Sequence, residues 1–298
     1  MSDALDILAQ AMPDPQPTRR RVLAWLAGAV AVAPLVACRP DAPMVAAAPL
    51  VRRASANADP ARLRARATTD GAGATLKRLF PGAELRHLDP FVLLDDFDVA
   101  APAGFPMHPH RGFEAFTYML DGRFHHRDTM GNDSEVATGG TQRFTSGRGA
   151  RHSEMPGAGQ SNRGLQLWVN LPRELKQMDP EYAAVHGADI PDVTRGRARI
   201  RTVVGPESPV VMRTDMRYLD IALPRGVAYE DEIAPAWKGV VYVIDGSVRV
   251  GDTRFGAGEA ALVQPGEIGL RAEPDSRVAM IVGRPHDQPI LQRGPFVD

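Results

Sequence analysis

Phe116-Thr117-Tyr118-Met119-Leu120-Asp121-Gly122 is an apolar, β-prone run that ends in Asp-Gly, which is a strong hairpin signal. A second run, Val240-Val241-Tyr242-Val243-Ile244-Asp245-Gly246, follows 124 residues later with Tyr, Asp and Gly in the same places. A repeat of this period is too long for a solenoid and indicates a duplicated domain. The chain also holds 28 glycines and 26 prolines, which favour many short strands over helical bundles. We therefore expect an all-β protein built from two antiparallel sandwiches or barrels.

Composition divides the chain into four segments. Residues 1–37 are predicted to be an export signal, and residues 38–69, rich in Ala, Pro and Arg, a flexible linker. Residues 70–180 form the expected first domain and residues 181–298 the second. Helical periodicity is weak, and the best candidate, Arg173 to Ala184, is predicted to be a short connector between the two domains.

Charge and cysteine content exclude several classes of protein. The chain has 35 basic and 36 acidic side chains, so a sequence-independent nucleic-acid binder is not expected. Its single cysteine, Cys38, excludes an intramolecular disulfide framework and any metal site with several cysteines.

The N-terminal segment has the layout of a secretory signal. Thr18-Arg19-Arg20-Arg21-Val22-Leu23 opens an apolar run to Ala37 and resembles a twin-arginine export signal. This run is shorter than the roughly 20 residues that a spanning helix needs. Leu35-Val36-Ala37-Cys38 resembles a lipoprotein cleavage box with Cys38 as the lipidated residue. We expect an exported, periplasmic or membrane-anchored protein; the alternative is an uncleaved anchor helix.

Two pairs of candidate metal ligands flank the first hairpin. His108 and His110 precede it, and His152 and Glu154 follow it, each pair at spacing i, i+2. Because strand side chains alternate between two faces, each pair projects to one side of its strand. Two such pairs on neighbouring strands can place three imidazoles and one carboxylate around a single ion. This ligand set suits a divalent first-row metal with open coordination positions.

The second half of the repeat carries no such set. The two places that match the first histidine pair hold Glu232 and Ala234, and Arg271 stands where the third histidine would fall. We therefore expect a metal site in the first half only.

The segment from about residue 88 to residue 180 resembles the pirin family, a branch of the cupin superfamily. The motifs that carry the resemblance are Leu88-Asp89-Pro90-Phe91-Val92-Leu93-Leu94-Asp95-Asp96-Phe97, His108-Pro109-His110-Arg111-Gly112-Phe113-Glu114, Gly147-Arg148-Gly149 with His152-Ser153-Glu154-Met155, and Gly164-Leu165-Gln166-Leu167-Trp168-Val169-Asn170-Leu171-Pro172. The match thins through the second domain and returns at Arg293-Gly294-Pro295-Phe296-Val297.

The resemblance implies a bicupin, which is two antiparallel jelly-roll barrels in tandem with few short helices. It also implies one metal ion in the N-terminal barrel, held by the positions that match His108, His110, His152 and Glu154. Many bacterial pirins are assigned quercetin 2,3-dioxygenase activity, and the human relative is known as an iron-dependent nuclear cofactor. We expect iron(II), while nickel, copper, manganese and zinc also tolerate three histidines and a glutamate.

Other polar residues near the motifs have several interpretations. By resemblance Glu154 is the ligand, whereas Glu114 is either a hydrogen-bond partner of a ligand histidine, which we favour, or a surface strand residue. The even spacing of Glu114 from His110 allows both to point the same way. His125 and His126 straddle two faces and are left out of the site. Trp168 is expected to be core or interface packing, with a pocket wall as the alternative.

The residues and the resemblance together predict a dioxygenase that inserts O₂ into an electron-rich, chelating enol such as a flavonol. Glu154 would be both a metal ligand and the group that takes the hydroxyl proton. The expected partners are a small aromatic enol and O₂, with no nucleic acid, and a monomer is expected. The alternative is a non-catalytic metal-binding, redox-sensitive protein-interaction module. An apolar pocket that opens onto the metal and fits a planar aromatic would favour the enzyme.

Overall fold

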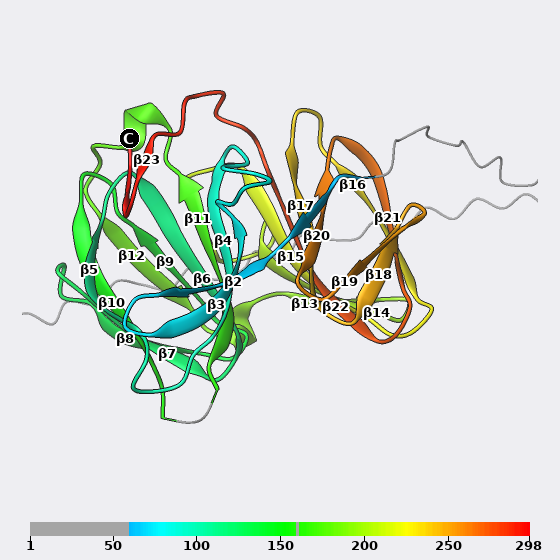
Figure 1. Cartoon of the computed structure of the whole chain (residues 1–298), viewed down its shortest axis with the longest axis horizontal. Helices are drawn as coiled ribbons and strands as arrows, with labels where there is room; N and C mark the ends of the chain where they lie inside the picture. Colours follow the sequence, from blue (N-terminus) through cyan, green and yellow to red (C-terminus); the bar gives the residue numbers. More distant parts are fainter. Residues whose placement is uncertain (1–59, 159–160) are drawn as a thin grey trace, which may run out of the picture. The chain divides into compact units, whose positions relative to one another are not determined.

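A computed structural model describes residues 60–158 and 161–298 of the chain (Figure 1). The predicted export signal, Cys38 and the linker up to residue 59 lie outside the described residues. The described part is built from strands and two short 3₁₀ turns, so the all-β prediction is confirmed. No helix in these two ranges is long and apolar enough to cross a membrane.

The first half contains a seven-stranded and a four-stranded antiparallel sheet. The seven-stranded sheet has the order β12-β9-β6-β11-β4-β3-β2, and the four-stranded sheet has the order β5-β10-β7-β8. The strands are β2 (Arg66–Asp70), β3 (Ala74–Phe80), β4 (Phe91–Asp98), β5 (Phe105–His110), β6 (Phe113–Asp121), β7 (Arg123–Asp128), β8 (Asp133–Ala137), β9 (Thr141–Thr145), β10 (Ala150–Pro156), β11 (Arg163–Asn170) and β12 (Glu181–Val185).

The second half repeats this arrangement with the same strand order. Its sheets run β1-β20-β17-β22-β15-β14-β13 and β16-β21-β18-β19. The strands are β1 (Arg62–Arg64), β13 (Asp192–Arg195), β14 (Ala198–Val204), β15 (Met216–Leu223), β16 (Ala228–Ile233), β17 (Lys238–Asp245), β18 (Ser247–Val250), β19 (Thr253–Gly256), β20 (Glu259–Val263), β21 (Gly266–Ala272) and β22 (Ser276–Gly283). The two tandem antiparallel domains predicted from the repeat are therefore present, and they are of the cupin type that the resemblance implies.

The repeated tyrosines join the two halves. Their large sheets share one apolar core cluster that includes Tyr118 on β6 and Tyr242 on β17. Tyr118 Oη donates to Asp220 Oδ2 of the second half at 2.7 Å, and Tyr242 Oη donates to Asp96 Oδ2 of the first half at 2.8 Å. Both hydrogen bonds are buried, so the repeated motif satisfies polar groups across the contact between the halves.

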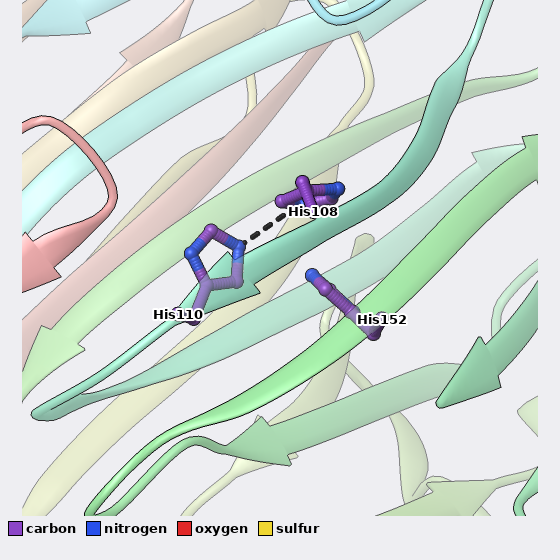
Figure 2. A group of neighbouring side chains, drawn as sticks. All are labelled: His108, His110 and His152. Atoms are coloured by element: carbon purple, nitrogen blue, oxygen red, sulfur yellow. Dashed lines mark hydrogen bonds between the residues drawn. The ribbon is translucent and has the colours of Figure 1, made fainter. Parts of the chain in front are cut away.

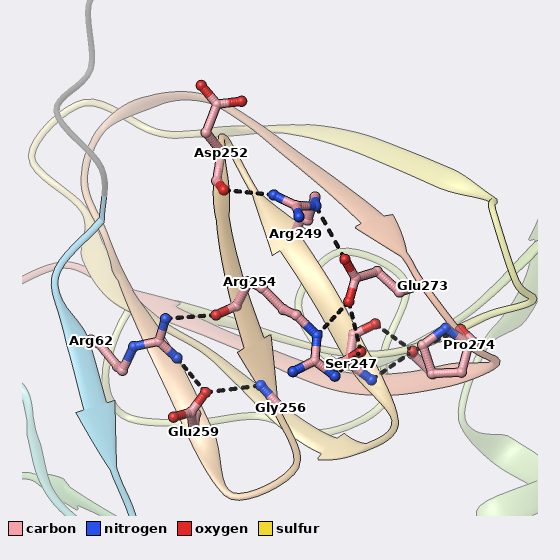
Figure 3. A network of polar contacts seen from close by, with 10 residues as sticks. Arg62, Ser247, Arg249, Asp252, Arg254, Gly256, Glu259, Glu273 and Pro274 are labelled. Carbon is pink, nitrogen blue, oxygen red and sulfur yellow. Dashed lines mark hydrogen bonds and ion pairs between the residues drawn. The ribbon is translucent and has the colours of Figure 1, made fainter.

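The two halves exchange edge strands. β1 precedes the first half in sequence but pairs with β20 of the second half, in the place that β12 occupies in the first. Arg62 on β1 pairs with Glu259 and donates to the carbonyl oxygen of Arg254 (Figure 3). The predicted linker, residues 38–69, therefore includes residues of two ordered strands, because β1 pairs with β20 of the second half and β2 pairs with β3 of the first half.

The segment predicted to be a helical connector contains no α-helix. It holds a single 3₁₀ turn, η1 (Arg173–Leu175), and most of strand β12, which pairs with β9. A proline at position 180 separates the two elements and disfavours helix in the residue before it. A second 3₁₀ turn, η2 (Gly187–Asp189), follows β12. β12, which lies beyond the expected boundary at residue 180, thus completes the first half.

The interiors of the two halves differ in composition. Between its two sheets the second half has one continuous apolar cluster of twenty buried residues. The first half has two smaller clusters, one around Phe97 and Phe124 and the other around Phe113 and Phe144. Polar side chains and a cavity occupy the first half besides these clusters, and they form the candidate site.

Candidate metal centre

Three histidines from two neighbouring strands meet in the first half. β5 carries His108 and His110, and β10 carries His152, which lies directly opposite His108 in the antiparallel pair. Their potential ligand nitrogens all lie within 4.8 Å of one another, and His108 Nε2 is 2.9 Å from His110 Nε2 (Figure 2). In the described ranges this is the one group of three or more potential ligand residues. The three histidines of the two predicted pairs therefore lie together, as predicted.

Burial keeps the imidazoles of His110 and His152 neutral. Removal from water, followed by the neighbouring His108, lowers the pKa of His110 to about 3. Burial also holds the pKa of His152 well below its usual range, with the other histidines adding to the effect. Neutral imidazole is the form that binds metal ions.

The hydrogen-bond partners of the rings also fit a metal ion. Neither ring nitrogen of buried His152 has a hydrogen-bond partner within the described residues. His108 Nδ1 is 2.8 Å from the carbonyl oxygen of Pro106, and His110 Nδ1 is 3.4 Å from that of Pro295. Backbone carbonyls of this kind orient a ligand histidine so that its other nitrogen faces the metal. An ion between the three rings would satisfy the unpartnered nitrogen that faces it.

Glu154 lies at the edge of the histidine cluster. Its Oε2 is 4.0 Å from His152 Nε2 and accepts a hydrogen bond from Gln166 Nε2 at 3.0 Å. Its Oε1 accepts from Thr117 Oγ1 at 2.9 Å and from Gln142 Nε2. Side chains of the large sheet thus hold this buried carboxylate beside the imidazoles.

The donors to Glu154 belong to a row of polar side chains that crosses the large sheet. The strand registers place Arg78 opposite Asp95, Asp95 opposite Gln166, Gln166 opposite Thr117, and Thr117 opposite Gln142. We call these five residues the polar row. They lie on five successive strands, β3, β4, β11, β6 and β9.

The second half shows that the fold does not need a polar row. The residues at the corresponding cross-strand positions there are Thr202, Leu219, Met280, Val241 and Ala261. All except Thr202 belong to the continuous apolar cluster of the second half. The polar row is therefore a feature of the candidate site.

The second half also lacks the histidines, although the matching positions differ from those predicted. Aligning the two Asp-Gly turns and following the strand pairs places Ile268 at the position of His152, Asp231 at that of His108 and Ile233 at that of His110. The predicted equivalents, Glu232, Ala234 and Arg271, come from counting along the sequence. Each differs from the paired position because the connections between strands differ in length.

Glu114 contacts none of the three histidines, and the prediction that it partners one of them is wrong. Its Oε1 accepts from Thr145 Oγ1 at 2.8 Å, and its Oε2 accepts from the backbone N–H of Arg213 at 2.9 Å. A turn at Arg111 and Gly112 separates β5 from β6, so the alternation of faces does not continue from His110 to Glu114. Glu114 is fully buried, which also excludes the surface alternative.

His126 is a buried neighbour of the site that the sequence prediction left out. Its ring stacks on Tyr182 at 4.0 Å and lies 5.3 Å from the ring of His152. Its Nε2 is 3.1 Å from Asp128 Oδ2, whereas exposed His125 pairs with Asp133. His126 alternates with Phe124 and Asp128 along β7, so the three side chains point to the same face of the strand. This spacing is the signal that could have shown that His126 points inward.

A cavity of about 560 Å³ opens onto His108 and His110. Trp168 is part of its wall, stacks on Phe113 at 4.2 Å and presents an edge to His110 at 5.0 Å. Trp168 therefore has both predicted roles, because it packs against the apolar cluster around Phe113 and also forms part of the cavity wall. The cavity is lined by His108, His110, Glu154, Gln166, Trp168, Leu76, Leu93, Phe97, Phe105, Pro106, Met107, Asp70, Gly71, Arg78, Asp95, Gln292, Gly294 and Pro295.

The C-terminal tail of the chain forms one side of this cavity. Its two short strands, β23 (Gln292–Arg293) and β24 (Phe296–Val297), pair with each other, and Phe296 bridges to Arg111. Lys176 Nζ donates to the carbonyl oxygens of Val297, at 2.9 Å, and Gly112, at 3.0 Å. The tail follows the second half in sequence, so both parts of the chain build the site.

The strand order and the histidine cluster define a bicupin with a candidate metal centre in its first half. Two family models match the chain: Pirin over residues 73–169, and the pirin C-terminal cupin domain over residues 218–298. A pirin-like protein of Solanum lycopersicum is 38% identical over 246 residues, which are 79% of this chain and 84% of that protein. The chain belongs to the pirin family.

Solved structures agree with this assignment. A quercetin 2,3-dioxygenase from Acinetobacter baumannii matches with a TM-score of 0.74 and 29% identity, over 80% of this chain and 91% of that chain. The bacterial pirin YhhW from Escherichia coli, solved in complex with nickel(II), matches with a TM-score of 0.63 over 76% of this chain and 98% of that chain. At 21% identity the second match shows the fold alone.

Proposed function

We propose that this chain is a metal-dependent dioxygenase of the quercetin 2,3-dioxygenase type, acting on a flavonol-like enol and O₂. The observation that carries the proposal is the cavity of about 560 Å³, which has aromatic walls at Phe97, Phe105 and Trp168. Two of the three histidines, His108 and His110, also line it. Largely apolar pockets with a few convergent polar groups are typical of small-molecule sites. The similarity to the Acinetobacter baumannii quercetin 2,3-dioxygenase supports the same reaction class.

His108, His110, His152 and Glu154 are the residues that would hold the ion. Iron(II) is the proposed ion, and nickel, copper, manganese and zinc accept the same donors. When bound, the ion supplies Lewis-acid and redox chemistry toward a chelating enol and O₂. The bacterial pirin YhhW from Escherichia coli was solved in complex with nickel(II), which is among the ions that these donors accept.

The protein side chains have separate roles in this proposal. Glu154 takes the proton of the substrate hydroxyl at one of its carboxylate oxygens, while Thr117, Gln142 and Gln166 keep the carboxylate in place. The aromatic walls hold a planar ring system and exclude water from the reacting end. A base held in position in this way raises the rate of proton transfer.

Oxygen consumption tests the activity. Metal-free protein is reconstituted with iron(II), nickel(II), copper(II) or manganese(II), and O₂ uptake is followed with quercetin. We expect at least one form to exceed free-ion controls. We also expect Glu154→Gln to lower turnover far more than quercetin binding, because it removes the base. If none of the four forms consumes O₂ above the controls, the activity is absent and the redox-sensitive interaction module becomes the better account.

We also propose that the chain is exported and tethered through Cys38. The proposal rests on Arg19, Arg20 and the box ending at Cys38, which lie outside the described residues. Two acyl chains give stable membrane anchoring, so the processed protein should sediment with membranes. Fractionation of cells that express Cys38→Ser tests this. We expect the variant in the soluble fraction, and retention equal to the wild type would indicate an uncleaved anchor helix instead.

A further inference from the structure

The polar row has a charged end that the proposed reaction does not use. Arg78 Nε donates to Asp95 Oδ1 at 2.8 Å, and its Nη2 donates to Asp95 Oδ2 at 2.7 Å. The same Nη2 donates to Asp70 Oδ2 at 2.9 Å. All three residues line the cavity onto which the histidines open.

The charged end of the polar row has hydrogen-bond donors and acceptors that are not used by its own residues. A guanidinium has five N–H donors, and no partner for Arg78 Nη1 is found in residues 60–158 or 161–298. The Asp95 carboxylate is nearly fully buried and receives one hydrogen bond from Arg78 on each oxygen, which leaves further lone pairs. The pair therefore offers both a donor and acceptors to a molecule in the cavity.

The fold accepts a neutral pair at the same place. In the second half the matching cross-strand pair is Thr202 and Leu219, and Leu219 belongs to the apolar cluster. An ion pair that served only to join the two strands would therefore be dispensable. Its presence where the cavity lies indicates a ligand-binding role.

The spacing matches a long planar substrate. Arg78 on β3 is two strands away from Gln166 on β11, which donates to Glu154. At the usual strand spacing, two steps are about 10 Å. A flavonol bound by its enol at the histidines would extend its remaining ring along the polar row in this direction.

We propose that Arg78 and Asp95 bind the hydroxyl groups on the ring of a flavonol-like substrate that lies farthest from the chelating enol. The site would then select substrates in which this distal ring is hydroxylated. The inference rests on the proposed function and adds to it a determinant of specificity.

Equilibrium binding to the nickel(II)-loaded full chain tests the proposal without turnover. The probes are quercetin, with two hydroxyls on the distal ring, and galangin, which has the same chelating enol and no hydroxyl on that ring. We expect wild-type protein to bind quercetin about tenfold more tightly than galangin, which is the effect of one hydrogen bond to a charged group.

The main variant is Arg78→Thr combined with Asp95→Leu, which copies the pair that the second half already accommodates. We expect it to bind galangin within about threefold of wild type and to lose the preference for quercetin. Asp95→Asn is a second variant that keeps Arg78 paired with Asp70, and it should lose part of the preference. The control is Arg66→Met, because Arg66 lies opposite Arg78 in the β2–β3 pair but is exposed and pairs with Glu84.

The outcomes separate the two proposals. An unchanged preference for quercetin in the double variant, or equal binding of both flavonols by wild type, would overturn the role of Arg78 and Asp95 while leaving the enol site intact. Absence of nickel-dependent binding of either flavonol to wild type would contradict the proposed function itself. Nickel content of each variant shows whether its histidine cluster is intact.

Discussion

Asp95 illustrates what a polar side chain costs in the interior of this protein. Burial raises the pKa of this carboxyl to about 6, and the adjacent Arg78 offsets the effect only in part. The folded state therefore keeps the proton of Asp95 to a higher pH than the unfolded chain does. The charge is retained at neutral pH at the expense of stability, as is common for groups that serve a ligand.

The pH dependence of stability should report this cost. Between about pH 4 and about pH 6 the folded protein binds more protons at Asp95 than the unfolded chain, so the free energy of unfolding falls as the pH rises. We expect the free energy of unfolding of the wild type, minus that of Asp95→Asn, to decrease by up to about 3 kcal/mol as the pH rises over this range. Urea unfolding of metal-free protein at several pH values measures it. If this difference stays constant or increases with pH, the raised pKa of Asp95 in the folded protein is contradicted.

At the residue scale, the sequence predicts the face to which a side chain points only for residues within one strand. His108 and His110 share β5, and their common direction follows from alternation alone. Glu114 lies beyond a turn, where the alternation of faces is interrupted, and its contacts come from Thr145 on β9 and from Arg213 in the other half of the molecule. The partners of Glu154 come from three strands of another sheet, so no local pattern in the sequence could identify them.

At the scale of elements, the tail holds one histidine of the candidate site in place. The Pro295 carbonyl lies beside His110, and the backbone of Val297 packs closely on Gly112. Gly112 has a φ of +83°, and a Cβ added there would lie 1.8 Å from the carbonyl oxygen of Val297. Only glycine permits both this conformation and this close approach.

Gly112→Ala should therefore displace the tail. Gly131→Ala is the matched control, because Gly131 has a φ of +94° and nothing lies within 4 Å of an added Cβ. Both variants should lose about 1–2 kcal/mol for the left-handed backbone. Only Gly112→Ala should also be digested several-fold faster by carboxypeptidase and bind nickel(II) more weakly. Equal behaviour of the two variants would show that the tail does not support the site.

Elements are predictable where the sequence pattern is local. The apolar, β-prone runs before Asp121 and Asp245 form the strands β6 and β17, as predicted. The Asp-Gly turns that follow join these strands to β7 and β18 of the other sheet, so the two predicted hairpins are wrong. β1 and β12 carry weak patterns of their own, and each becomes a strand because a distant sheet edge is available to pair with it. Such pairing is set by the tertiary structure, so the exchange of edge strands was not predictable from sequence.

At the scale of the whole molecule, the two halves of the duplicated fold differ in what their interiors contain. The second half fills its interior with one apolar cluster, whereas the first half gives part of its interior to the polar row and the cavity. Tyr118 and Tyr242 join the halves through buried hydrogen bonds to Asp220 and Asp96. The shared core thus supports a first half that buries many polar groups.

The most direct test of this account is the metal content of the purified chain. Wild type loaded with nickel(II) and dialysed should hold one ion per chain by elemental analysis. The variant with His108→Ala and His152→Ala should hold none, because an open site has few ligands to spare. The control with Glu232→Ala and Arg271→Ala, two residues of the second half that carry no predicted ligand role, should still hold one. A histidine double variant that retains one tightly bound ion per chain would contradict the assignment of the metal centre.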